Sequence, residues 1–341
     1  HKSVRLYVHK RAVSTVVALF VFAFMGWLVW GDNAQQNEPA YLYISREDEY
    51  DDVIAQLEDN EMLNQVWPFR MVAMLSGYPM SVKPGRYEIP TRMGTLPLLR
   101  NLMGGLETPT MLRWQRLRTR REIANYFGQR LDINPSQFYS ILSDRELLKK
   151  YGLTPETVPA IFIPNTYEFY WTTTETELLE RMLKEYEAFW NPYRMHKADS
   201  LGLKPMEVMT LASIVEAETW RVDERPRIAG VYLNRLNKDM RLQADPTVIY
   251  AVGNFNIRRV RKRHLMVNSR YNTYRYKGLP PGPILTPSPS SIDAVLNAEE
   301  HDYIYFCARP SLDGYHWFAR TWSQHKANAY RYRQMMNTRN G

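Results

Sequence analysis

Two glutamates, Glu216 and Glu218, lie at the end of an otherwise apolar run, LASIVEAETW (211–220). On an α-helix their side chains would point roughly 200° apart around the axis, so they could not share a proton or act on one substrate bond. A single carboxyl group in apolar surroundings can still act as a general acid, because burial favours its protonated form. The pair fits equally well as the two edges of an amphipathic helix, and the spacing alone does not choose between the two glutamates.

Several other chemistries are disfavoured by missing motifs. The sequence has no nucleotide-binding glycine loop, no zinc-protease H-E-x-x-H and no G-x-S-x-G, and its seven histidines are scattered. We therefore expect no metal and no cofactor. Carboxylates, aromatic side chains and amides remain, and these are the groups that enzymes acting on sugars use.

The glutamate pair must be positioned by a helix that starts near Pro205, where apolar residues recur at spacings of three and four up to Val215. A second helix is expected after VDERP, with Asp223 as its N-cap. The segment 279–291, LPPGPILTPSPSS, is expected to be irregular. Two β-rich runs, 302–308 and 315–320, predict a hairpin, and a terminal helix is expected from Ser323.

The N-terminal region carries nineteen uncharged residues, 12–30 (AVSTVVALFVFAFMGWLVW), about the length that crosses a bilayer as a helix. The four basic residues before this run have no acidic neighbour, which predicts a cytoplasmic tail over residues 1–11. We therefore expect a single-pass protein of the cytoplasmic (inner) membrane, with its catalytic domain outside the cytoplasm.

The remaining chain divides by composition. Residues 31–40 are polar and predict a linker, and residues 41–105 read as a small α+β module of two helices around a turn and a short extended segment. Residues 106–341 form a larger α+β region. The net charge of +8 does not indicate a nucleic-acid partner, since four of the 44 basic residues lie in the tail. The basic run 258–264, RRVRKRH, is expected to be a solvated loop.

Ordered motifs from about residue 206 onward resemble the YceG-like family of membrane-bound endolytic murein transglycosylases. They are ASIVEAET followed by ER, then VYLNRL, MRLQADPTVIYAVG, YNTYRYKGLPPGPI and SQHKAN. Upstream, KPGRYEI and FIPNTYEFY resemble that family's LysM-like module and connecting segment. The resemblance implies an α+β protein with a single N-terminal transmembrane helix, a LysM-like module at 41–105, and a connecting and catalytic transglycosylase domain at 106–341.

The resemblance also implies the site. The family's catalytic glutamate corresponds to the second Glu of E-x-E, Glu218, which makes Glu216 a supporting residue at the substrate site. The family's glycan cleft corresponds to Gln243, Asp245, Thr247, Tyr271, Asn272 and Thr273.

The implied reaction is endolytic cleavage of the MurNAc–GlcNAc bond of peptidoglycan, which leaves 1,6-anhydroMurNAc ends. Glu218 would give its proton to the leaving oxygen and then remove the proton of the C6 hydroxyl. Two alternatives remain. One is a hydrolase in which Asp245 activates water, and the other is a non-catalytic peptidoglycan-binding scaffold of the cell-wall growth machinery. The expected partners are glycan strands and the cytoplasmic membrane, with a peptidoglycan synthase as a candidate.

Overall fold

The structure is a computed structural model that describes residues 2–34, 37–311 and 313–340, without the side chains of residues 2–14, 28 and 337–340. Its helices and small sheets make a mixed α+β protein, as predicted. The chain divides into two compact units. Unit 1 comprises residues 1–112, 130–132 and 168–173, and unit 2 comprises residues 113–129, 133–167 and 174–341.

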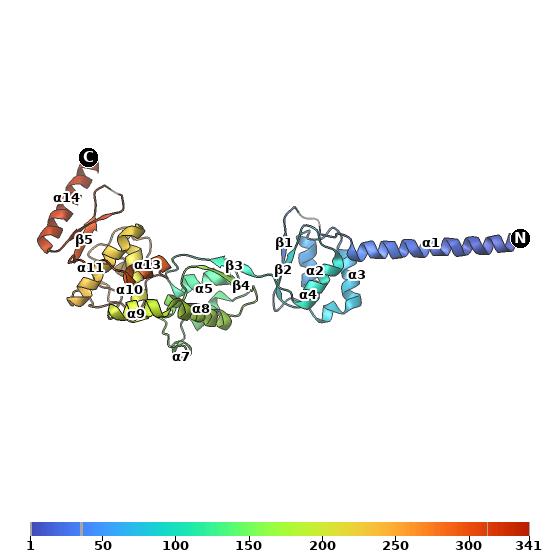
Figure 1. Cartoon of the computed structure of the whole chain (residues 1–341), viewed down its shortest axis with the longest axis horizontal. Helices are drawn as coiled ribbons and strands as arrows, with labels where there is room; N and C mark the ends of the chain where they lie inside the picture. Colours follow the sequence, from blue (N-terminus) through green and yellow to red (C-terminus); the bar gives the residue numbers. More distant parts are fainter. Residues whose placement is uncertain (1, 35–36, 312, 341) are drawn as a thin grey trace. The chain divides into compact units, whose positions relative to one another are not determined.

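Unit 1 is built around a two-stranded antiparallel sheet in which Leu42 lies opposite Tyr87. Alternate strand residues are buried because successive side chains of a strand point to opposite faces. Buried residues such as Leu57, Phe69 and Leu98 complete one hydrophobic core. In chain order the elements are α1 (Lys2–Trp30), β1 (Ala40–Ile44), α2 (Tyr50–Asp59), α3 (Val66–Ser76), η1 (Tyr78–Met80), β2 (Gly85–Ile89) and α4 (Thr95–Gly104) (Figure 1).

Helix α1 contains the predicted membrane span, residues 12–30. Within the part of the chain that the structure describes, no helix is both long enough and apolar enough to cross a membrane. The side chains of residues 12–14 and 28, and those of the predicted cytoplasmic tail, lie outside the described residues. The span and the tail therefore stay predictions.

The predicted linker is partly packed into unit 1. Asn33 and Ala34 are buried, and the Asn33 side chain donates to the carbonyl of Gln65 (2.8 Å) and accepts from the N–H of the same residue (3.0 Å). The polar composition predicted a linker, and the polar groups of Asn33 are satisfied inside the unit.

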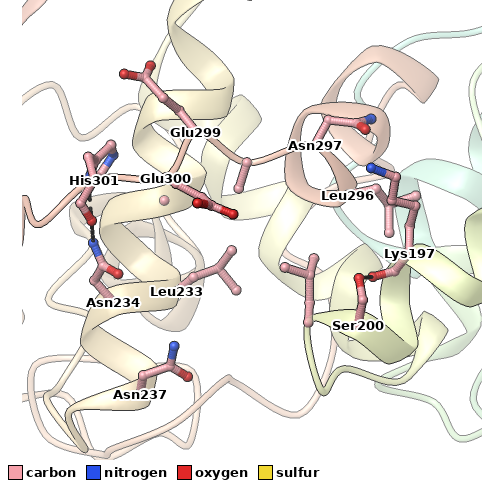
Figure 2. Close-up of a pocket in the computed structure, with 13 residues that line it drawn as sticks. Lys197, Ser200, Leu233, Asn234, Asn237, Leu296, Asn297, Glu299, Glu300 and His301 are labelled. Atoms are coloured by element: carbon pink, nitrogen blue, oxygen red, sulfur yellow. Dashed lines mark hydrogen bonds between the residues drawn. The ribbon is translucent and has the colours of Figure 1, made fainter.

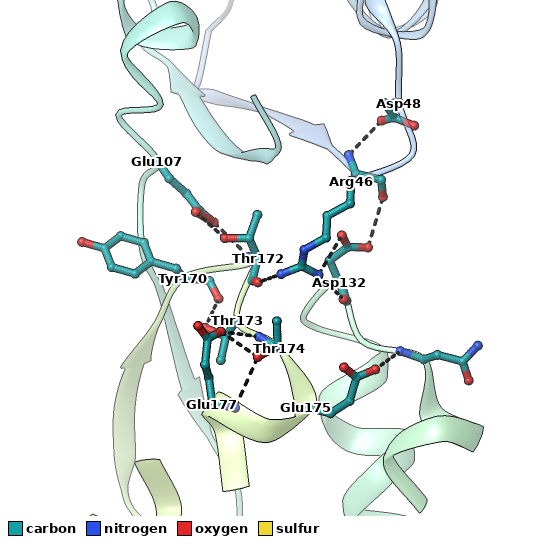
Figure 3. A network of polar contacts seen from close by, with 12 residues as sticks. Arg46, Asp48, Glu107, Asp132, Tyr170, Thr172, Thr173, Thr174, Glu175 and Glu177 are labelled. Carbon is teal, nitrogen blue, oxygen red and sulfur yellow. Dashed lines mark hydrogen bonds and ion pairs between the residues drawn. The ribbon is translucent and has the colours of Figure 1, made fainter. Parts of the chain in front are cut away.

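Two short segments from much later in the chain belong to unit 1 (Figure 3). Asp132 accepts a hydrogen bond from the Ser45 hydroxyl (3.1 Å) and pairs with Arg46 (3.7 Å). Glu107 accepts from both the N–H and the hydroxyl of Thr172, at 3.0 and 2.7 Å. Unit 1 therefore contains residues from two later segments, which are not continuous in sequence with the module predicted at 41–105.

Unit 2 contains the motif-rich region. Its helices and hairpin are α5 (Arg120–Gly128), α6 (Pro135–Ile141), α7 (Arg145–Lys149), η2 (Val158–Ile161), α8 (Glu175–Phe189), α9 (Pro192–Ser200), α10 (Pro205–Glu218), η3 (Val222–Glu224), α11 (Arg225–Asn237), α12 (Asp245–Val252), η4 (His264–Met266), α13 (Pro289–Leu296), β5 (Tyr305–Ala308), β6 (His316–Ala319) and α14 (Trp322–Asn340). The strands β3 (Thr110–Arg113) and β4 (Thr166–Phe169) form a separate two-stranded sheet.

Helix α10 lies at the centre of unit 2. Every side chain from Val208 to Glu216 is buried, because α9, α11, α12 and α13 all pack against this helix. The prediction of a single apolar face was therefore too narrow. The polar residues are satisfied within the helix, since Thr210 donates to the carbonyl of Met206 (2.9 Å) and Ser213 donates to that of Thr210 (2.7 Å).

The C-terminal predictions are confirmed with small changes. Strands β5 and β6 form the expected antiparallel hairpin, with Phe306 opposite Phe318, and α14 begins at Trp322. The irregular segment is shorter than expected, because α13 already begins at Pro289. The N-cap prediction was wrong: Glu224 precedes α11, and the Asp223 carboxylate instead accepts the Tyr315 hydroxyl (2.8 Å).

Candidate active site

Glu218 is the last residue of α10. The backbone of Thr219 is extended (φ −144°, ψ 139°), so the helix ends there and the Glu218 side chain emerges beside α11, α12 and the β5–β6 hairpin. It is half-buried, and the Tyr232 hydroxyl on α11 donates a short hydrogen bond to its Oε1 (2.6 Å). The carboxyl group is thereby held in one orientation.

The electrostatic surroundings of Glu218 favour its protonated form. Burial raises the pKa of this carboxyl from 4.5 to about 7, and the negative charge of Asp245 acts in the same direction. The Tyr232 hydrogen bond and the charge of His316 both oppose the increase. Near neutral pH a substantial fraction of Glu218 therefore carries a proton that it can donate, as a general acid must.

Glu218 lines a cavity of about 300 Å³. Carboxylates, one arginine and a row of aromatic side chains meet there, a combination that suits a sugar ring with its polar rim and apolar face. The lining residues are Glu218, Tyr232, Arg235, Leu242, Gln243, Asp245, Tyr274, Tyr305, Phe306, Cys307, Ala308, His316, Trp322 and His325.

Three of the predicted site residues meet in this cavity, namely Glu218, Gln243 and Asp245. Gln243 has a left-handed backbone (φ +53°), an uncommon conformation for a residue other than glycine, and its Oε1 accepts from Arg235 (2.7 Å). Asp245 begins α12, and its Oδ1 accepts the Tyr274 hydroxyl (2.6 Å). Both side chains are thus fixed by neighbours that themselves line the cavity.

Four other predicted residues are not among those that line this cavity. Thr247 and Thr273 are buried and share a hydroxyl–hydroxyl hydrogen bond (2.8 Å), and the buried Asn272 side chain donates to the carbonyls of Leu265 and Val267. Tyr271 packs on another aromatic ring, that of Tyr250, at 4.6 Å. These contacts favour a supporting role, and direct substrate contact by the four residues stays a prediction.

Glu216 faces a different part of unit 2. It is 4% exposed, and its Oε2 accepts from the N–H (2.7 Å) and hydroxyl (2.6 Å) of Ser288 and from the hydroxyl of Ser291 (2.7 Å). Arg116 lies 3.4 Å from its Oε1. These bonds outweigh the effect of burial, so the pKa of Glu216 is lowered below 4.5. The hydrogen bonds from these donors to the ionised Glu216 carboxylate connect the loop before α13 to α10.

Known proteins share this architecture. The YceG-like family model matches residues 42–331, which is most of the chain. The chain belongs to the YceG-like family. It is similar to the endolytic murein transglycosylase of Bacillus subtilis (strain 168), with 36% identity over 171 residues that cover 50% of this chain and 46% of that protein. It is also similar to the endolytic murein transglycosylase of Streptococcus pneumoniae serotype 2 (strain D39 / NCTC 7466), with 29% identity over 277 residues, 72% of this chain and 50% of that protein.

The coverage of these YceG-like relatives is partial: the chain spans about half the length of the curated relatives it matches. A crystal structure of a YceG-like protein from Listeria monocytogenes is 29% identical in sequence, with a TM-score of 0.56. That match covers 86% of this chain and 99% of the crystallised one. The shared fold therefore extends over both units.

Two further cavities of this YceG-like chain lack a comparable acid. The one in Figure 2 has a volume of about 560 Å³ and lies between α9, α11 and the chain after α13. Two of its polar groups already have partners: Glu299 pairs with Arg227, and the Asn234 amide donates to the carbonyl of His301. The other, about 550 Å³, contains the ionised Glu216. Among the described residues, no group of three His, Cys, Asp or Glu side chains could hold a metal ion.

Several residues of the Glu218 cavity were missed from the sequence. Tyr232 and Arg235 lie three apart in the motif VYLNRL, so one face of α11 presents both, and that spacing was a usable signal. His316 and Trp322 come from the hairpin and from α14. No spacing links them to Glu218, because only the folded chain brings the hairpin beside the end of α10.

Proposed function

We propose that this chain is an endolytic lytic transglycosylase that cleaves peptidoglycan glycan strands, with Glu218 as the proton donor. The observation that carries the proposal is a half-buried carboxyl group with a pKa of about 7 in an aromatic cavity. The relatives named endolytic murein transglycosylase support the same substrate and reaction. A non-catalytic scaffold would gain nothing from the energetic cost of keeping an acid desolvated there.

The proposed step needs no water and no cofactor. Glu218 gives its proton to the glycosidic oxygen, and the bond from that oxygen to C1 of the muramic acid breaks with its electron pair going to the oxygen. The C6 hydroxyl oxygen then bonds to C1 and releases its proton to a base, which closes the 1,6-anhydro ring. The Glu218 carboxylate formed in the first half of the step can take that proton and return to its starting state.

The product distinguishes this reaction from hydrolysis. Mass spectrometry of digested glycan strands is expected to show ends lighter than reducing sugars by about 18 Da, one water, since ring closure replaces hydrolysis. Asp245 shares the cavity with Glu218 and is the residue that would activate water in a hydrolase. Reducing ends alone would therefore overturn the transglycosylase proposal and favour the hydrolase.

We also propose that α1 anchors the protein in the cytoplasmic membrane, with residues 32–341 outside the cytoplasm. The uncharged run 12–30 and the basic residues before it support this, as do the exposed apolar side chains of Leu19, Phe20 and Phe22. A reporter that works only outside the cytoplasm, fused at the C-terminal end, should be active. Activity of a reporter restricted to the cytoplasm would contradict this orientation. A peptidoglycan synthase as a partner stays a prediction.

Unit 1 is proposed to be the LysM-like, glycan-binding module. Support comes from the motif KPGRYEI, whose residues 85–89 form strand β2, with alternate side chains buried in the unit. Hydrogen–deuterium exchange of the full chain, inactivated by Glu218→Gln and mixed with glycan strands, should show protection within residues 41–105. Protection confined to unit 2 would mean that unit 1 does not bind glycan.

A further inference from the structure

His316 lines the Glu218 cavity and is paired with the buried Glu224, and neither residue has a role in the step above. Glu224 ends η3 and is 4% exposed. Its Oε1 accepts the backbone N–H of His316 (2.9 Å), and its Oε2 lies 2.6 Å from the His316 Nδ1. The His316 side chain is 13% exposed and lines the same cavity as Glu218.

The geometry of this pair determines the tautomer of the imidazole. An ionised carboxylate can only accept hydrogen bonds, so Nδ1 of His316 must carry a proton. In the neutral ring the lone pair is then on Nε2. The ring is also held edge-on against Phe306 (5.2 Å between centroids, 89° between planes), and the His316 carbonyl accepts from Arg309 (3.2 Å). A histidine acts as a general base in this arrangement, in which a carboxylate orients the ring and stabilises its charged form.

We propose that His316 is a catalytic base in this cavity, accepting the proton of the C6 hydroxyl on Nε2 while Glu218 gives its own proton to the glycosidic oxygen. This inference rests on the proposed function. The electron pair of the O–H bond forms the new bond to C1, and the pair of the broken C1–O bond stays on the leaving oxygen. The imidazolium, stabilised by Glu224, then passes its proton to the Glu218 carboxylate, and both residues return to their starting states.

The surrounding charges are compatible with this exchange. When His316 is protonated, its charge lowers the pKa of Glu218, so the two groups are close enough to interact electrostatically. Asp245, the other carboxylate of the cavity, is engaged by Tyr274 and has no histidine partner of this kind. The titratable and charged groups near the pair on neighbouring elements are Glu218, Arg227, Tyr232, Arg235, Asp245, Tyr274, Tyr305, Cys307, Arg309, Tyr315 and His325.

The test is the pH dependence of kcat/KM for the full chain in detergent on glycan strands. The wild type should give a bell-shaped profile, with a basic limb near pH 7 where Glu218 loses its proton and an acidic limb where the catalytic base becomes protonated. His316→Gln should lower kcat by roughly 10²-fold with little change in KM, and it should lose the acidic limb. Glu224→Gln should move the acidic limb to lower pH, because the imidazolium loses the charge that stabilises it.

Tyr232→Phe is the matched control. It removes a hydrogen bond that lowers the pKa of Glu218, so it should move the basic limb to higher pH and leave the acidic limb in place. Melting temperatures identify variants that fail to fold. If His316→Gln does not fold, the position of the acidic limb in Glu224→Gln decides whether the inference holds. An unchanged acidic limb in both His316→Gln and Glu224→Gln overturns the inference. The proposed function fails separately, if the wild type itself releases no anhydro ends.

Discussion

Replacing Glu218 by glutamine is expected to reduce glycan cleavage by at least roughly 10²–10⁴-fold, the range that general acid–base catalysis supplies. The amide has the same shape and can still accept the Tyr232 hydrogen bond, but it cannot donate a proton to the leaving oxygen. Folding should not weaken, because burial disfavours the charged form of Glu218, which the substitution removes. The measurement is the single-turnover rate of anhydro-end formation, together with glycan affinity and the melting temperature.

Glu216→Gln is the control on the same helix. Its side chain contacts Ser288 and Ser291 instead of the Glu218 cavity, so the folded variant should retain cleavage within a few-fold of the wild type. An inactive Glu216→Gln with an active Glu218→Gln would show that the two roles are reversed. If both variants retain full activity, Glu218 is not the proton donor. A wild type that cleaves no glycan would instead favour the scaffold alternative.

Truncating Glu216 to alanine should instead cost stability, by about 3–5 kcal/mol in the free energy of unfolding. The substitution leaves the donors of Ser288 and Ser291 without their acceptor and Arg225, which is 6% exposed, without a compensating charge. Urea denaturation at pH 7 measures the loss. The exposed Glu300→Ala is a suitable control and should change the free energy of unfolding by less than about 0.5 kcal/mol.

The contribution of Glu216 should also depend on pH. Its folded-state pKa lies below the ordinary value of 4.5, because the hydrogen bonds from Ser288 and Ser291 and the charge of Arg225 outweigh burial. Such a group stabilises the fold above its unfolded-state pKa, and the stabilisation is lost as the pH falls below 4.5. Glu216→Gln should therefore show a weaker decrease in stability below pH 4.5 than the wild type. Parallel decreases in the two proteins would contradict the assignment.

Local sequence patterns predicted much of unit 2 correctly. The spacing of apolar residues identified the helix that carries the glutamates, and β-rich runs on either side of a turn identified the hairpin. The same periodicity showed that Glu216 and Glu218 diverge. These features depend on neighbours within a few residues, and backbone geometry relates such neighbours in the same way in any fold.

Other features depend on residues far apart in the chain. The burial of α10 on all sides was not predicted, because it arises from four other helices that no local pattern relates to one another. The recruitment of residues 130–132 and 168–173 into unit 1 is of the same kind. Local composition also did not predict the partner of Asn33, whose polar side chain is satisfied by Gln65 inside the fold.

By itself, the sequence determined the family motifs, the helix that carries E-x-E and the opposite directions of its two carboxyl groups. Only the tertiary structure decided which chemistry each group has. Glu218 faces a cavity where burial raises its pKa to about 7, whereas Glu216 meets donors 72 and 75 residues away that lower its own. The pairing of Glu224 with His316, 92 residues apart, likewise exists only in the folded chain. The physical reason is that the pKa of a carboxyl group depends on solvation and nearby charges, which distant segments supply.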